Sequence, residues 1–147
     1  MFTITEEALI ARSAEDVFDF LTDGGNRPLW DTQVISEELT SPGPVGVGST
    51  IHTRMRTMGV EADFEWRVTQ FARPTGMAIV STTGILATAF AFRFAAVGDG
   101  CRVSATVEGS PTGMMRLAEP LIAESVRSNL AAGLARARAV LEAPPGR

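Results

Sequence analysis

Alternating apolar and polar positions dominate the first two thirds of the chain and predict strands there. Residues 2–11 and 34–39 both read as strands, the second followed by the glycine- and proline-rich loop SPGPVGVGS. Between them, Ser13 is placed to cap a short helix with acidic residues in its first turn, which ends before Gly24. The segment NRPLWD at 26–31 adds a turn or one more turn of helix.

The last third of the chain changes to a helical period. From about Thr112 to Glu142, apolar side chains recur at helical spacing and predict one long helix with an apolar stripe. The predicted stripe consists of Met114, Ala118, Ile122, Val126, Leu130, Leu134 and Leu141. Pro120 removes a backbone donor within this segment, so we expect the helix to kink or restart there.

Charge pairing predicts the register of a hairpin in the middle of the chain. Pairing the strands outward from a turn at 58–59 places Arg56 opposite Glu61 and Arg54 opposite Asp63. The other face of the hairpin then carries Ile51, Thr53, Met55, Ala62, Phe64 and Trp66. A slip by one residue would bring the charges into the core, so this register is favoured over its neighbours.

The same reasoning applies to the last hairpin but leaves a third strand undecided. With a turn at 98–99, one face of the last hairpin holds the pairs Phe94/Val103, Phe92/Ala105 and Phe90/Val107. For the strand 77–83 the preceding loop leaves the register open. We take Ala78, Val80 and Thr82 as its inward residues.

Length, charge and cysteine content narrow the classes of protein. The 147 residues fit one domain, 1–147, and a formal net charge of -4 without a basic run argues against a nucleic-acid partner. The single cysteine, Cys101, forms no internal disulfide and fits a reducing compartment. The N-terminus has no secretory h-region, and no apolar run reaches the roughly 18 residues of a membrane-spanning helix. We therefore expect a cytoplasmic protein without integral membrane association. Whether it forms a homodimer is left open by the sequence.

The residue types of common catalytic and metal sites are scarce. His52, the only histidine, faces outward opposite Glu65 in the derived register, which favours a surface ion pair over a catalytic base. One histidine and one cysteine do not supply a metal site, so we expect neither a metal nor a cofactor. GVGST at 46–50 lacks the lysine of a phosphate loop and leads into a strand, so it reads as a turn. No Ser-His-Asp arrangement supports nucleophilic catalysis.

Several segments, in their order along the chain, resemble one superfamily. They are SAEDVFDFLTD followed by Trp30-Asp31, GVGST before a strand, VTQFARP, AFRFAAVGDGCRVSATVE and NLAAGLARARAVLE. Over nearly its whole length the chain resembles the START/polyketide cyclase (SRPBCC) superfamily. The resemblance implies the α+β helix-grip fold: a curved antiparallel β-sheet gripping a long C-terminal helix, with two short helices between the first two strands. It also implies a hydrophobic cavity between sheet and helix, used across the family for lipids, sterols, polyketides and hormones.

The inward faces of the strands and the helix define the predicted ligand site. Polar groups such as the Thr53 hydroxyl, set within an apolar lining, orient a bound ligand. The predicted ligand-binding residues are Trp30, Thr53, Met55, Phe64, Trp66, Phe90, Phe92, Ala118, Ile122 and Val126. The resemblance implies that Trp30 and Asp31 lie near the cavity mouth. Asp31 is then the best carboxylate for acid/base work, although a structural cap is the favoured role for it.

Three functions stay open on this basis. The leading hypothesis is a binding or carrier module for a small hydrophobic or amphipathic molecule of lipid, polyketide or aromatic type, because no catalytic set accompanies the apolar face. The alternative is an enzyme resembling a polyketide cyclase/aromatase, with proton transfer through Asp31, Arg27 or a pocket threonine. The third is an interaction protein with a closed cavity and an exposed apolar patch.

Overall fold

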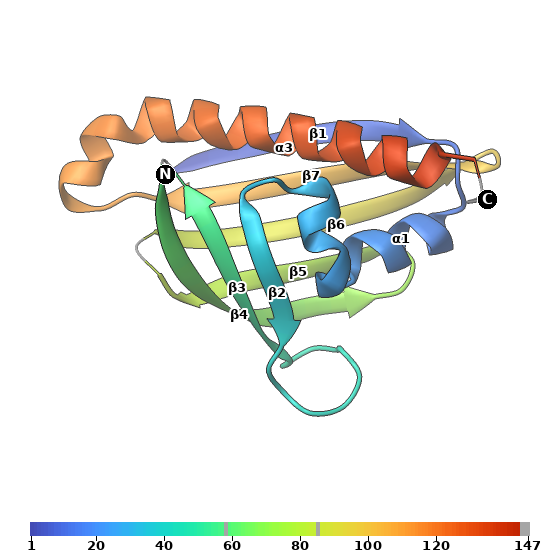
Figure 1. Cartoon of the computed structure of the whole chain (residues 1–147), viewed down its shortest axis with the longest axis horizontal. Coiled ribbons are helices and arrows are strands. Elements are labelled where there is room, and N and C mark those ends of the chain that lie inside the picture. Colours follow the sequence, from blue (N-terminus) through green and yellow to red (C-terminus); the bar gives the residue numbers. More distant parts are fainter. Residues whose placement is uncertain (58, 85, 145–147) are drawn as a thin grey trace.

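The computed structural model describes residues 1–57, 59–84 and 86–144 and shows a seven-stranded sheet curved around the C-terminal helix (Figure 1). The strand order is β1-β7-β6-β5-β4-β3-β2, and neighbouring strands are antiparallel. The elements are β1 (Phe2–Ile10), α1 (Ala14–Thr22), η1 (Gly24–Asn26), α2 (Arg27–Trp30), β2 (Val34–Leu39), β3 (Thr50–Thr57), β4 (Val60–Ala72), β5 (Gly76–Thr83), β6 (Ala87–Val97), β7 (Gly100–Ser110), η2 (Gly113–Ala118) and α3 (Glu119–Glu142). The predicted fold class is confirmed. Met58, in the predicted turn, lies outside the described residues.

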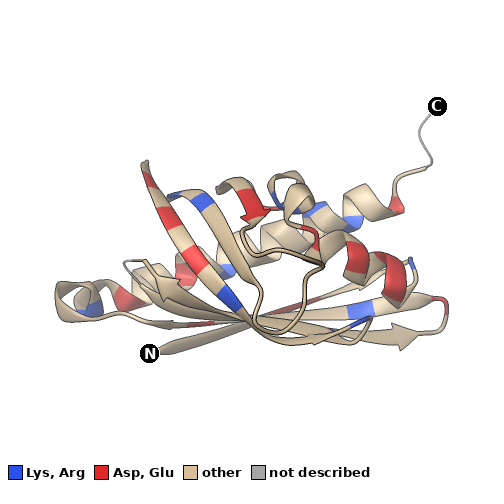
Figure 2. Ribbon diagram, turned by 90° about the horizontal axis from the view of Figure 1, so that it is seen from below, with Lys and Arg blue, Asp and Glu red and all other residues tan. Residues whose placement is uncertain are grey.

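The register predicted from charge for the β3–β4 hairpin is confirmed. Every predicted pair is present, including Arg54 opposite Asp63. Arg54 Nη2 also lies 2.6 Å from Glu61 Oε1, and Figure 2 shows charged positions banded along this hairpin. His52 stays on the same outer face, but its Nε2 lies 3.0 Å from Asp63 Oδ1 rather than pairing with Glu65 directly opposite.

The β6–β7 register is also confirmed, whereas the inward face predicted for β5 is wrong. Met77 and Ile79 are the buried residues of β5, not the predicted Ala78, Val80 and Thr82. Both alternating sets are rich in apolar residues, so hydrophobicity did not separate them. Two register shifts between β4 and β5, which bend the sheet, decide which set faces inward.

The C-terminal helix restarts at the predicted proline. The 3₁₀ segment η2 precedes α3, and Pro120 lies in the first turn of α3, where a missing backbone N–H leaves no helical bond unmade. Met114 is 86% exposed, so its place in the predicted apolar stripe is wrong, because η2 does not continue the periodicity of α3. The buried residues of α3 are Leu130, Gly133, Leu134, Ala137 and Leu141, and Ile122 and Val126 are partly buried.

The short helices pack between the sheet and the second half of α3. Ser13 caps α1 as predicted, because its Oγ accepts a hydrogen bond from Asp16 N at 3.1 Å. α3 packs mainly on β1 and on α2 (Figure 1). A Cβ on Gly133 would lie 3.2 Å from the Trp30 ring, so glycine allows α3 to approach α2 closely. No helix in the described ranges has the length and apolar character needed to cross a membrane.

Candidate functional site

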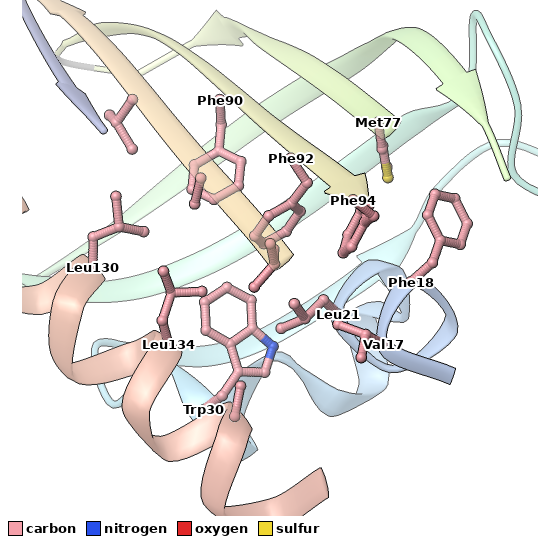
Figure 3. Close-up of a cluster of buried hydrophobic side chains, with 14 of the residues drawn as sticks. Val17, Phe18, Leu21, Trp30, Met77, Phe90, Phe92, Phe94, Leu130 and Leu134 are labelled. Atoms are coloured by element: carbon pink, nitrogen blue, oxygen red, sulfur yellow. The ribbon is translucent and has the colours of Figure 1, made fainter. Parts of the chain in front are cut away.

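Aromatic side chains cover the concave face of the sheet next to α1 and α2. Phe90, Phe92 and Phe94 follow one another on β6, with successive ring centroids 4.8 and 5.6 Å apart. The Trp30 ring meets Phe92 edge to face at 5.9 Å, and Phe18 meets Phe94 at 5.2 Å (Figure 3). Three predicted site residues, on α2 and β6, therefore belong to one aromatic cluster.

A chain of buried hydrogen bonds runs beside this cluster. Trp66 Nε1 donates to Thr53 Oγ1 at 3.1 Å, and Thr53 Oγ1 donates to Glu37 Oε1 at 2.7 Å. Thr53 is 1% exposed, and the Phe64 ring stacks on Trp66 at 5.6 Å. Because its hydroxyl both accepts and donates, Thr53 carries the polar contact from the sheet to Glu37 without leaving a buried group unpaired.

Arg27 lies at the centre of the polar groups. Its Nη1 donates to Glu37 Oε1 at 3.1 Å, and its Nε and Nη2 donate to Asp31 Oδ2 at 3.3 and 3.2 Å. The guanidinium carbon lies 4.8 Å from the Trp30 ring centroid and 5.5 Å from that of Phe90. The side chains of Arg27, Asp31 and Glu37 are only 12%, 6% and 9% exposed. A planar guanidinium donates hydrogen bonds to carboxylates along its edge and packs its face on aromatic rings, and Arg27 does both.

Asp31 is held as a structural carboxylate. In addition to the two bonds from Arg27 to Oδ2, its Oδ1 accepts from Gln33 N at 3.1 Å and from Asn129 Nδ2 at 3.2 Å. The bond from Asn129, which sequence reasoning did not single out, ties α2 to α3. With both oxygens occupied, the geometry favours the structural role for Asp31 over proton transfer.

Glu37 is the central site residue that sequence reasoning missed. Strict alternation from Val34 would turn Ser36 and Glu38 inward, but a register shift between Val34 and Ser36 turns Glu37 toward Thr53 instead. Both hydrogen bonds to Glu37 end on Oε1, and Oε2 accepts none from the described residues. The buried network therefore holds one cation, two carboxylates and one free carboxylate oxygen.

Two neighbouring hollows meet at Glu37. The outer hollow has a volume of about 320 Å³ and lies between α1, η1 and strands β2 to β4. The inner hollow, of about 20 Å³, is walled by Arg27, Phe90 and Phe92 among others, and is about large enough for one water molecule. Both hollows are lined by Thr22, Glu37 and Ile51. Thr22 Oγ1 donates to Phe18 O at 2.7 Å, so Glu37 is the ionisable group that the two described hollows share.

A family model described as polyketide cyclase/dehydrase and lipid transport matches residues 1–142. The chain belongs to this family. A search of curated proteins gives no match. Membership in the polyketide cyclase/dehydrase and lipid transport family confirms the predicted resemblance and implies a cavity for hydrophobic ligands, without specifying the ligand.

Solved structures similar to this family member share its fold. A protein of Thermus thermophilus is 18% identical with a TM-score of 0.81, and the match covers 93% of this chain and 94% of that one. A START superfamily protein of Mycobacterium smegmatis is 16% identical with a TM-score of 0.75, covering 95% and 97%. The di-domain ARO/CYC protein BexL from the BE-7585A biosynthetic pathway is 21% identical with a TM-score of 0.76, covering 98% and 51%. The chain thus spans about half of BexL.

Of the predicted site residues of this family member, Phe90 and Phe92 line the inner hollow, and the others line neither hollow. Met55 and Phe64 are partly buried on β3 and β4, toward the hairpin turn. Ala118, Ile122 and Val126 are partly buried around the start of α3. The predicted residues Phe64, Trp66 and Thr53 contact one another and Glu37, and Trp30, Phe92 and Phe90 contact one another. Arg27 links the two groups, because it binds Glu37 and lies over the Trp30 and Phe90 rings.

Cys101 offers no nucleophile to this site. It is buried on β7 at 1% exposure. Burial raises the pKa of its thiol, so the neutral form is favoured over the reactive thiolate. Of the Cys101 thiol and the Glu37 carboxylate, the carboxylate with its free oxygen is therefore the group better placed to exchange a proton.

Proposed function

We propose that this family member binds a small apolar or amphipathic molecule of lipid, polyketide or aromatic type on the concave face of its sheet. The observation that carries the proposal is the hydrogen-bonded chain Trp66–Thr53–Glu37 within an aromatic lining. An apolar surface with a few convergent polar groups holds and orients a small molecule. The family description, which includes lipid transport, is consistent with this role.

The proposed ligand lies between the sheet and the start of α3. On the sheet, the residues that we place around the ligand are Thr53, Met55, Phe64, Trp66, Phe90 and Phe92. Trp30 on α2 and, on the side of the C-terminal helix, Ala118, Ile122 and Val126 complete the proposed site. Trp30 Nε1 is buried and has no hydrogen-bond partner among the described residues; in Figure 3 it lies on the side of Leu21. An acceptor atom on a ligand would satisfy this donor. Because Cys101 has no cysteine partner, we place this binding in a reducing compartment such as the cytoplasm.

Thermal unfolding with a fatty acid, a flavonoid, a sterol and an aromatic polyketide tests the proposal. A ligand at about 100 times its Kd stabilises the folded state by about 2.7 kcal/mol and raises Tm. We expect Phe64→Ala to weaken the responding probe by about tenfold, because it removes aromatic contact area from the ligand. Phe20→Ala is the control, since Phe20 is a partly buried phenylalanine on α1 and is not among the residues proposed to surround the ligand. No rise in Tm with any probe, or an equal loss of probe affinity in both variants, would contradict the proposed ligand site.

One observation favours a second function, the cyclisation of a flexible polyketide. Glu37 lines both hollows, and its Oε2, which accepts no hydrogen bond from the described residues, can exchange a proton with a ligand, whereas both oxygens of Asp31 are hydrogen-bonded. If the protein converts a linear poly-β-ketone to an aromatic product, measured by its absorbance, we expect Glu37→Gln to lower kcat by about 100-fold. An unchanged kcat in this variant would exclude Glu37 as the proton carrier.

A further inference from the structure

The outer hollow has an apolar floor of its own. The Phe18 and Phe71 rings meet edge to face at 5.4 Å, and Leu39, Val45 and Ile51 complete its apolar lining. The volume of about 320 Å³ lies at the lower end of the roughly 300–1,000 Å³ found for small-molecule sites. The hollow therefore has room for a short apolar chain or a single ring.

The rest of the lining is acidic. The carboxylates of Asp19, Asp23, Glu37 and Glu38 line the hollow, and Arg73 is the one cation among the described lining residues. Arg73 Nε and Nη2 each donate to an oxygen of Asp19 at 2.8 Å, so the positive charge of Arg73 is balanced by Asp19. Figure 2 shows acidic positions on α1 and β2, the elements that flank the hollow. The lining thus has an excess of negative charge.

Glu37 lines the hollow and has one carboxylate oxygen without a hydrogen bond from the described residues. Its side chain is nine-tenths buried, Arg27 and Thr53 bind only Oε1, and Oε2 accepts no bond from the described residues. A Cβ built on Gly24, which also lines the hollow, would lie 3.3 Å from Oε2. A carboxylate oxygen at this depth is stabilised by a hydrogen-bond donor, most strongly by a charged one.

We propose that the outer hollow binds a protonated amine carried on a short apolar chain, at a second site that shares only Glu37 with the polar network of the proposed ligand site. The ammonium group donates to Glu37 Oε2 and is attracted by Asp23 and Glu38 at the rim. The chain lies on Phe18 and Phe71. An anionic molecule of the same size is repelled, and a neutral one gains no charge-assisted hydrogen bond.

An organic cation fits this lining better than a bare metal ion. The described parts of the chain hold no group of three or more histidine, cysteine, aspartate or glutamate side chains placed to bind a metal. Divalent ions require such convergent ligands, whereas an ammonium group needs few partners and its chain needs the apolar floor. The chemical class inferred is therefore a small cationic amphiphile.

Three probes with the same chain and different head groups test the charge preference. Octylamine, octanol and octanoate are titrated into the protein by calorimetry at neutral pH, where a primary amine is protonated because its pKa is about 10. We expect octylamine to bind about tenfold more tightly than octanol, more weakly as salt is added, and octanoate to bind least. Equal or tighter binding of octanol or octanoate would overturn the inference.

Gly24→Ala tests the position of the ammonium group. The new methyl group would lie 3.2 Å from both Cγ and the backbone O of Glu37 and 3.3 Å from its Oε2. It would therefore displace Glu37 and crowd the proposed position, so we expect octylamine affinity to fall about tenfold. Gly46→Ala is the matched control, because its methyl group would meet no atom within 4 Å and neither glycine has a left-handed φ. Circular dichroism checks that both variants are folded. Equal affinities in the two variants would contradict the proposed position.

Phe64→Ala separates this site from the proposed ligand site. Octylamine affinity is expected to stay unchanged in this variant, because Phe64 does not line the outer hollow. A loss in Phe64→Ala without a loss in Gly24→Ala would place the amine on the concave face and overturn the inference, while the proposed function would stand. Octylamine binding without a response to any probe of the proposed function would contradict that function alone.

Discussion

Replacing Arg27 by methionine is expected to lower the free energy of unfolding by about 3–5 kcal/mol. Methionine keeps much of the apolar length of the side chain but removes the cation that Asp31 and Glu37 share. Both carboxylates would then lie buried without a counter-ion, which is strongly unfavourable. Urea unfolding followed by far-UV circular dichroism measures the change.

Arg12→Met is the matched control for this experiment. Arg12 also pairs with an aspartate four residues away, Asp16, and its Nη1 donates to Leu141 O at 2.7 Å, but its side chain is 44% exposed. Surface pairs contribute about 0–1 kcal/mol and one hydrogen bond about 0.5–1.5 kcal/mol, so we expect a smaller loss than in Arg27→Met. A loss in Arg27→Met no larger than in Arg12→Met would mean that the buried network does not stabilise the fold around the site.

Replacing Phe92 by alanine is expected to cost about 3–5 kcal/mol. Its ring contacts Trp30, Phe90 and Phe94 and is 5% exposed. Truncation removes these contacts and leaves a cavity that adds to the inner hollow, which Phe92 already lines. The same urea titration measures the free energy of unfolding.

Phe92→Leu provides the comparison for the aromatic cluster. Leucine keeps most of the apolar volume, so we expect a smaller loss than with alanine, about 1.5 kcal/mol or less. If alanine costs no more than leucine, the neighbouring rings collapse into the space. The cluster then does not form the rigid wall on which the proposed binding depends.

Charge and turn residues were sufficient to predict much of the sheet. Pairs such as Arg54 with Asp63 select one register of the β3–β4 hairpin, because a shift by one residue would bury charges. That register also placed Thr53 and Trp66 on the inward face, where both are buried. The aromatic residues that the sheet contributes therefore follow from alternation, whereas Trp30 on α2 was placed near the cavity mouth by the family resemblance.

Local irregularities of the sheet account for what sequence reasoning missed. On β5, Met77 and Ile79 face inward because of register shifts against β4, while both alternating sets are apolar enough to be buried. On β2, a similar shift turns Glu37 toward Thr53. Nothing in the alternating pattern marks such a shift, so a strand read as regular gives the wrong face.

The polar part of the site depends on contacts between distant segments. Arg27 and Asp31 were singled out as candidate proton carriers, but their bonds to Glu37 and Asn129 bring α2 together with β2 and α3. Such contacts depend on how the helices settle on the sheet. Sequence reasoning therefore named two members of the network and favoured a structural role for Asp31, but it did not identify Glu37 as the residue with the free oxygen.

The most direct test of ligand binding on the concave face is an NMR titration that follows the indole N–H signals. The chain has two tryptophans, and Trp30 and Trp66 both lie in the proposed walls. With the probe that raises Tm most, we predict that at least the Trp66 indole signal moves in step with saturation, while the Nε–H signal of Arg54 on the outer face stays in place. Saturable binding that leaves both indole signals unmoved would contradict the proposed site.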